Sequence, residues 1–171
     1  MSFLSRIFGL GGDPREELRP LWHRTVELAR EHAWFADLGV EDSVAGRFDM
    51  IATILSLVLL RMEGEPDLAR PSVMLTELFV EDMDGQLRES GVGDQVVGKH
   101  IGRLMAALGG RLGALREALA SADDALLADY AGRNTTLLAE ASRDRLAAGL
   151  RQFADRLAQT DTEALLKGEI A

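Results

Sequence analysis

The stretch MIATILSLVLL, at residues 50–60, constrains the fold of this chain more than any other feature. It is apolar on nearly every side of a helix, and such a surface is buried only when other elements cover the helix on several sides. The run is too short to span a membrane, because a spanning helix needs about 20 apolar residues. We therefore expect a central helix at about 44–62.

Helical periodicity continues through the rest of the chain, and no alternating strand pattern of useful length interrupts it. Asp42 or Ser43 can cap the central helix. The other predicted helices run from about Pro14 to His32, from between Asp67 and Pro71 to Glu89, from Asp94 to about Ala120, and through 135–158. In the last of these, the side chains expected to face inward are Leu138, Ala141, Leu146, Leu150, Phe153 and Leu157. The sequence predicts an all-α, single-domain bundle of about six helices.

The first twelve residues, MSFLSRIFGLGG, differ in composition from the rest of the chain. Phe3, Ile7 and Phe8 belong to an apolar set around the single charge of Arg6, and glycines end the segment. Two interpretations stay open: an arm that frays or packs back on the domain, and a short anchor whose apolar side chains contact a membrane surface.

The expected organisation is a flexible apolar N-terminal arm at 1–12 and a helical domain at 13–171. Within that domain we expect a motif-bearing core at about 14–115 and an Ala-rich helical tail at about 121–171.

The overall charge disfavours nucleic acid as a direct ligand. The chain has 28 acidic and 19 basic side chains, a net charge of -9, which repels phosphate backbones. It has no Cys, so disulfides and thiolate metal sites are excluded and a cytoplasmic location is the default expectation.

The segment EDMDGQLRESGVGDQVVGKH, at 81–100, invites a metal or phosphate interpretation that fails at named positions. An EF-hand aligned on Gly85 would place Val80 at its first ligand position and Gly91 at its twelfth. A dinucleotide fingerprint lacks its third glycine, because that position is Val96. The three histidines have no metal-pair spacing, so we expect neither a metal nor a cofactor, and no catalytic residue.

The same segment predicts a helix end, a glycine corner and a new helix start. Gly91 suits the left-handed residue that closes a helix, and Asp94 suits the cap of the next. Asp84 and Arg88 are placed for an exposed ion pair four residues apart.

Asp82 falls at the edge of the apolar face of its helix, where a carboxylate needs a cation. Arg47 lies in the opening turn of the central helix, where a positive charge opposes the helix dipole. We therefore expect Arg47 to pair with Asp82, with Lys99 or Arg103 as rival partners.

The helix at 94–120 carries a ridge of small residues at spacings of four: Gly98, Gly102, Ala106 and Gly110. Each glycine inside a helix costs about 1 kcal/mol relative to Ala, so the ridge calls for the close approach of another helix. Internal packing is favoured, and a helix of a partner protein is the alternative.

Two blocks of sequence together resemble the ubiquinol-cytochrome c chaperone family: GVEDSVAGRFDM at 39–50 and EDMDGQLRESGVGDQVVGKHI at 81–101. The resemblance covers roughly 14–115 and fades in the Ala-rich tail. The residues carried over as structural motif or partner-binding candidates are Arg47, Phe48, Asp49, Asp82, Asp84, Arg88, Asp94 and Lys99.

The resemblance implies a non-enzymatic assembly factor that binds newly made cytochrome b during biogenesis of ubiquinol-cytochrome c reductase, together with a small partner protein. Loops of membrane proteins on the cytoplasmic side are rich in Lys and Arg, so an acidic helical surface suits such a partner. The expected location is cytoplasmic, with peripheral contact at the inner membrane. A helical adaptor with another client is the alternative, and an enzyme using Asp82 or Asp84 is a remote one.

Overall fold

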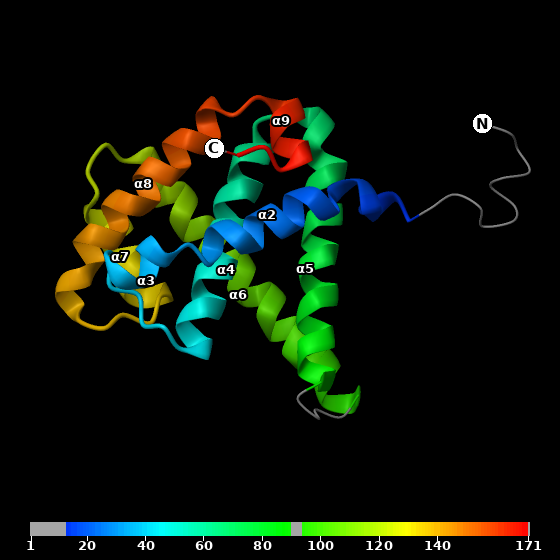
Figure 1. Ribbon diagram of the computed structural model, residues 1–171, viewed down its shortest axis with the longest axis horizontal. Coiled ribbons are helices and arrows are strands. Elements are labelled where there is room, and N and C mark those ends of the chain that lie inside the picture. The colour runs from blue at the N-terminus through cyan, green and yellow to red at the C-terminus, as the bar shows by residue number, and fades with distance from the viewer. Residues whose placement is uncertain (1–12, 90–93, 171) are drawn as a thin grey trace, which may run out of the picture.

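The computed structural model describes residues 13–89 and 94–170, and every structural statement below concerns these ranges (Figure 1). The elements in chain order are η1 (Pro14–Leu18), α2 (Arg19–Ala29), α3 (His32–Ala36), α4 (Val44–Glu63), η2 (Pro66–Leu68), α5 (Ala69–Glu89), α6 (Asp94–Ala120), α7 (Ala125–Asn134), η3 (Glu140–Ser142), α8 (Arg143–Gln159) and α9 (Thr162–Lys167). The prediction of an all-α, single-domain bundle is confirmed.

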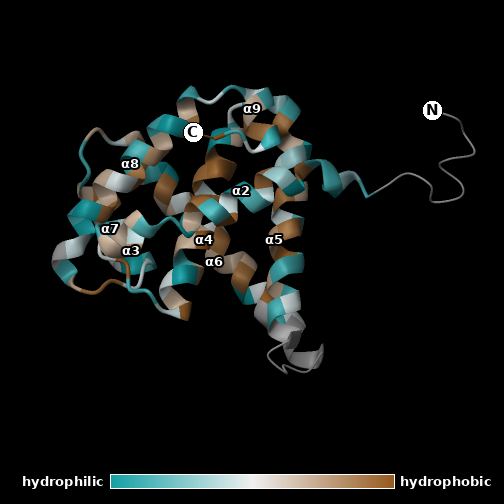
Figure 2. Ribbon diagram, viewed as in Figure 1, coloured by the Kyte–Doolittle hydropathy of each residue, from teal (hydrophilic) through white to brown (hydrophobic). Residues whose placement is uncertain are grey.

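Helix α4 is the centre of this bundle. Its residues from Met50 to Leu59 are all buried, and α2, α5, α6 and α8 contact it. Figure 2 shows hydrophobic residues gathered along α4 in the middle of the molecule. The helix begins where the Gly46 amide donates to the Ser43 hydroxyl at 3.2 Å, which satisfies one amide of the first turn. The expected central helix and its Ser43 cap are confirmed.

Helix α2 crosses α4 and also contacts α5. The ring of Trp22 meets Phe79 of α5 edge-on, with centroids 5.9 Å apart. The C-terminal segment folds back on the same helix, because Ile170 is buried and its carbonyl oxygen accepts from Arg24 Nη2 at 2.9 Å. Gly168, with a φ of 74°, makes the turn that brings this segment in.

The structure corrects two predicted helices. The single helix expected at 14–32 is divided into η1 and α2, and α3 begins only at His32. The helix expected at 135–158 begins as α8 at Arg143. Before it come η3 and, between α7 and η3, the non-helical residues 135–139, with an isolated bridge between Val40 and Leu137. Because Leu138 lies in that segment, its side chain is 67% exposed, and the expectation that it faces inward is wrong.

The later part of the same prediction is confirmed, because the four remaining large residues of the predicted inward face are buried in α8: Leu146, Leu150, Phe153 and Leu157. The Ala141 side chain lies outside the described part. Within the described ranges, none of the helices combines the length and apolar character needed to cross a bilayer.

Candidate functional site

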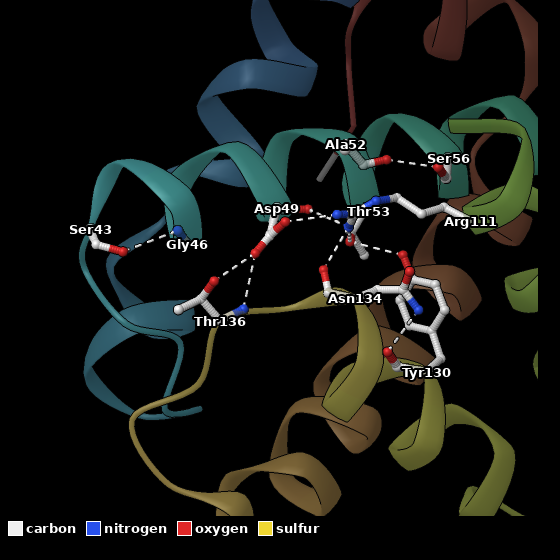
Figure 3. A network of polar contacts seen from close by, with 10 residues as sticks. All are labelled: Ser43, Gly46, Asp49, Ala52, Thr53, Ser56, Arg111, Tyr130, Asn134 and Thr136. Atoms are coloured by element: carbon white, nitrogen blue, oxygen red, sulfur yellow. Dashed lines mark hydrogen bonds and ion pairs between the residues drawn. The ribbon is translucent and has the colours of Figure 1, made fainter. Parts of the chain in front are cut away.

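Asp49 of α4 is the centre of a buried polar network that joins three helices (Figure 3). One carboxylate oxygen accepts from Arg111 Nη2 of α6 at 2.7 Å. The other accepts from the Thr136 amide at 3.0 Å and from the Thr136 hydroxyl at 2.9 Å. The Asp49 and Arg111 side chains are only 15% and 11% exposed. The pair is therefore a mostly desolvated, well-satisfied ion pair.

Arg111 extends this network to α7. Its Nη1 donates to the Asn134 carbonyl oxygen at 2.7 Å, at the end of α7. Below it, the hydroxyls of Thr53 and Tyr130 are 2.9 Å apart, and burial raises the pKa of the Tyr130 phenol. Through these bonds the network fixes α6 and α7 against α4. We call this structural network around Asp49 and Arg111 the lock.

Beside this lock, α5 and α6 diverge (Figure 1). Their side chains line a groove, which we call the α5–α6 groove. Its volume is about 750 Å³. Leu59 and Glu63 of α4 and Arg15 of η1 complete a lining that otherwise comes from α5 and α6. The apolar lining residues are Leu59, Val73, Val80, Ile101, Met105 and Leu112. Leu112 follows Arg111 directly, so the ion pair with Asp49 holds this wall of the groove in place.

Acidic side chains also line the groove. The groove is lined by Glu63, Glu77, Glu81 and Asp84, and by one basic residue, Arg15. Two of these acids are paired with arginines: Glu81 lies 2.9 Å from Arg15 Nη1, and Glu63 lies 2.7 Å from Arg116 Nη2. An apolar surface bordered by acids is complementary to an apolar segment that carries Lys or Arg.

The small-residue ridge of α6 is on the molecular surface. Gly98, Gly102, Ala106 and Gly110 are exposed, and a Cβ atom added at any of the three glycines would have no contact within 4 Å. Internal packing of the ridge, the favoured expectation, is therefore wrong for the described residues. The ridge adjoins the groove, since Gly102 follows Ile101 and Ala106 follows Met105.

Arg47 does not pair with Asp82, and this prediction is wrong. Its Nε lies 2.6 Å from a carboxylate oxygen of Asp42, and its side chain is 58% exposed. The hydrogen bond from Arg47 also lowers the pKa of the Asp42 carboxyl. The reason is local: the chain before α4 brings an acid to the first turn, so the unfavourable position of Arg47 is neutralised without a distant partner.

Asp82 is only half-buried, because it lies at a second pocket between α2 and α5. Arg19 and His23 of α2 and Arg30, which directly follows α2, line the same pocket. Lys99 is exposed on α6, and neither it nor Arg103 forms an ion pair with Asp82 among the described side chains.

The remaining motif candidates separate into two places. Asp49 is in the lock, and Phe48 packs partly buried against the core beside it. Asp84 lines the α5–α6 groove at some distance along the chain. The side chains of Arg88 and Asp94, and with them the predicted Asp84–Arg88 pair, lie outside the described part, although α6 does begin at Asp94. Gly91, Phe3, Ile7 and Phe8 also lie outside it.

Sequence reasoning missed Arg111, although a signal was present. Arg111 lies three residues after Leu108 and four before Leu115, and both leucines are buried. A cation on an apolar helix face needs an acid, and the argument applied to Asp82 would have found it.

Comparison with known proteins identifies relatives of this arrangement. The sequence profile of the family described as "Ubiquinol-cytochrome C chaperone" matches residues 36–171. The crystal structure of the Cbp3 homolog from Brucella abortus superposes with a TM-score of 0.81 at 31% sequence identity, covering 99% of this chain and 96% of that chain. No curated protein matches the chain.

The match also corrects the predicted extent of the resemblance. It begins at residue 36 and continues to residue 171, so the expectation that the resemblance fades in the Ala-rich tail is wrong. The tail supplies Tyr130, Asn134 and Thr136 to the lock around Asp49, which gives it a structural part in the fold. The chain belongs to the ubiquinol-cytochrome c chaperone family.

Proposed function

We propose that this chain binds newly made cytochrome b during biogenesis of ubiquinol-cytochrome c reductase, and that it does so without catalysing a reaction. Family membership gives the chain an assembly-factor role. The α5–α6 groove is the observation that carries the proposal, because it is apolar, open and bordered by acids.

The groove suits a segment of a membrane protein that has not yet reached its final packing. Apolar side chains of such a segment would cover Val73 and Met105, which are 57% and 38% exposed. Lys and Arg residues flanking the segment would face Glu77 and Asp84 at the border of the groove. The exposed Gly102 and Gly110 would let a helix approach α6 closely.

The proposal extends to a small partner protein and to location. The ridge of α6 is exposed beside the groove, so a small partner protein would bind along it at Gly98 and Gly102. Contact with the inner membrane through Phe3, Ile7 and Phe8 belongs to the same proposal. Unchanged membrane partitioning after deletion of residues 2–10 would refute that contact.

A strain that lacks this chain tests the role itself. We expect it to lose cytochrome b and its reductase, measured by haem absorption and by immunoblotting of membranes. Restoring the wild-type chain should restore both levels. Normal levels in the deletion strain would refute the assembly role.

A matched pair of variants tests the groove. Met105→Glu places a charge in the apolar lining, whereas Leu126→Glu places one at a similarly exposed apolar residue, 41% against 38%, outside the groove. Both chains should fold, because both sites are on the surface. We expect Leu126→Glu to restore cytochrome b and Met105→Glu to fail. Equal restoration by the two variants would exclude the groove as the binding site.

A further inference from the structure

The α5–α6 groove is an apolar surface that the described part of the chain leaves uncovered. Met105 and Val73 belong to the few large apolar side chains that stand exposed, and both line the groove. Val44, Leu126 and Leu138, which are also exposed, do not line it. An apolar groove of about 750 Å³ that is bordered by charge is typical of a binding surface.

The described chain begins beside this groove. Asp13 is the first described residue, and its carboxylate accepts from Arg15 Nε at 2.9 Å. Arg15 in turn lies 2.9 Å from Glu81 of α5 through Nη1, and both Arg15 and Glu81 line the groove. The hydrogen bonds from Arg15 lower the pKa of the Asp13 carboxyl to about 2, so the carboxylate stays charged near neutral pH. The N-terminal arm, residues 1–12, therefore joins the domain at the edge of the groove.

The composition of the arm matches the chemistry of the groove. Its apolar residues are Phe3, Leu4, Ile7, Phe8 and Leu10, and its single charged residue is the base Arg6. The groove offers an apolar lining and an excess of acids over bases. The match therefore holds both for apolar contact and for charge.

The arm is also long enough to extend along the α5–α6 groove. The α5 wall from Val73 to Asp84 is about 16 Å long at the helical rise of 1.5 Å per residue. Twelve extended residues reach up to about 40 Å, and residues 3–10 as a helix would cover about 12 Å. Gly11 and Gly12 precede Asp13, and glycine permits the reversal that would direct the arm back over the groove.

We propose that the N-terminal arm occupies the α5–α6 groove while no client is bound. Its apolar side chains cover Val73 and Met105, and Arg6 faces the acids at the border. The client and the arm then compete for one surface, so loading of a client releases the arm. This competition rests on the proposed function, whereas docking of the arm does not.

Pulsed electron paramagnetic resonance on the full-length chain tests the docking. Because the chain has no Cys, Ser5→Cys and Gly102→Cys give two unique spin-label sites, one in the arm and one at the edge of the groove. Neither removes an apolar residue of the proposed contact. A docked arm gives one narrow, short distance distribution. The control pair, Ser5→Cys with Leu138→Cys, places the second label at an exposed site that does not line the groove.

Variants identify what holds the arm. Adding Met105→Glu to the Ser5/Gly102 pair should broaden the distance distribution, whereas adding Leu126→Glu should leave it narrow. Arg6→Glu should also broaden it, and Arg6→Lys should not, because the lysine keeps the charge. A broad Ser5/Gly102 distribution in the unmodified background would overturn the proposal, as would a narrow one that Met105→Glu does not change.

Anionic vesicles distinguish the membrane from the groove as the partner of the arm. In this account the arm contacts the membrane only after a client has released it from the groove. If the Ser5 label enters the bilayer of vesicles while the client is absent, and the distance to Gly102 is broad, docking is refuted. The distance measurement and the deletion strain test the two proposals separately. A narrow Ser5/Gly102 distance together with normal cytochrome b in the deletion strain would refute cytochrome b as the client but would still support docking of the arm.

Discussion

Arg111 of α6 donates from Nη2 to the Asp49 carboxylate of α4 at 2.7 Å, across 62 residues of sequence. This ion pair is mostly buried, and Thr136 and the Asn134 carbonyl satisfy further groups of both side chains. The ion pair holds α6 in place at Arg111, and the next residue, Leu112, lines the α5–α6 groove. The shape of the groove therefore depends on Asp49, a residue of the first motif block, although Asp49 does not line the groove.

Removing one member of this pair should destabilise the fold strongly. Asp49→Ala leaves the Arg111 guanidinium buried without its counter-ion, which typically costs about 3–5 kcal/mol of unfolding free energy. Arg47→Ala is the matched control on the same helix, because it removes only an exposed pair with Asp42, which water screens and which contributes little to stability. Urea denaturation of the two variants measures both values. Equal losses would contradict the assignment of the lock to Asp49.

Tyr130 is the single tyrosine of the chain, so its titration can be followed by absorbance without interference from another phenol. Burial raises the pKa of its hydroxyl, and we expect tyrosinate to form only above the ordinary pKa of about 10. A raised folded-state pKa means that its stabilising effect is complete below the unfolded pKa and is lost as the pH rises through the folded one. Titration at the ordinary value in the folded chain would show that Tyr130 is accessible to water.

Loss of the Tyr130 hydroxyl should have a smaller effect than loss of Asp49. Tyr130→Phe removes the 2.9 Å hydrogen bond to Thr53 and keeps the ring in the core, so we expect a loss of about 1 kcal/mol in denaturant unfolding. A loss as large as that of Asp49→Ala would mean that the phenol, and not the ion pair, is the centre of the lock.

Two glycines should respond to alanine in opposite directions. Gly102→Ala adds a methyl group in open space within α6, so it should stabilise the helix by about 1 kcal/mol. Gly46→Ala adds a methyl group that would collide with the Glu41 carbonyl oxygen, so it should destabilise the chain. Thermal unfolding of both variants checks the signs. Destabilisation by Gly102→Ala would indicate a packed ridge, contrary to the exposed one found here.

The sequence predicted the helix bounds correctly where capping residues mark the helix ends. The predicted bounds of the helix from Asp94 to Ala120 agree with α6, and Ser43 caps α4 as expected. Prediction failed where partners are distant in sequence. The bridge of Val40 to Leu137 and the hydrogen bond of the Thr136 amide to Asp49 hold residues 135–139 extended, and helical periodicity carries no sign of either.

The choice of ion-pair partners failed for a similar reason. The sequence pairs Arg47 with Asp82 because the carboxylate falls at the edge of an apolar face and the cation opposes a helix dipole, yet Asp42, five residues before Arg47, is the partner. Arg111 lies outside both motif blocks, so the motifs do not point to it. The groove was beyond prediction altogether, because its shape depends on the angle between α5 and α6, and side-chain periodicity does not determine that angle.

Acid should loosen the contact between α9 and Glu65, which lies between α4 and η2. Hydrogen bonds from the Thr162 hydroxyl, at 2.5 Å, and from Arg61 lower the pKa of Glu65. A lowered folded-state pKa gives stability that is present above the unfolded value, about 4.3, and is lost as the pH falls through the folded one. The stability difference between the wild-type chain and Glu65→Gln should therefore shrink from pH 7 to pH 3. A constant difference would show that the Glu65 charge contributes nothing.

The most direct test of the account is site-specific photo-crosslinking in the native host. A photoreactive residue replaces Met105 in the groove, and in separate chains it replaces Leu126 or Leu138, which are exposed outside it. Crosslinked products are identified by mass spectrometry. We predict cytochrome b crosslinked from position 105 and not from the two control positions. Crosslinks to cytochrome b from Leu126 or Leu138 but none from Met105, or a different protein captured at Met105, would contradict the assignment of the α5–α6 groove to this client.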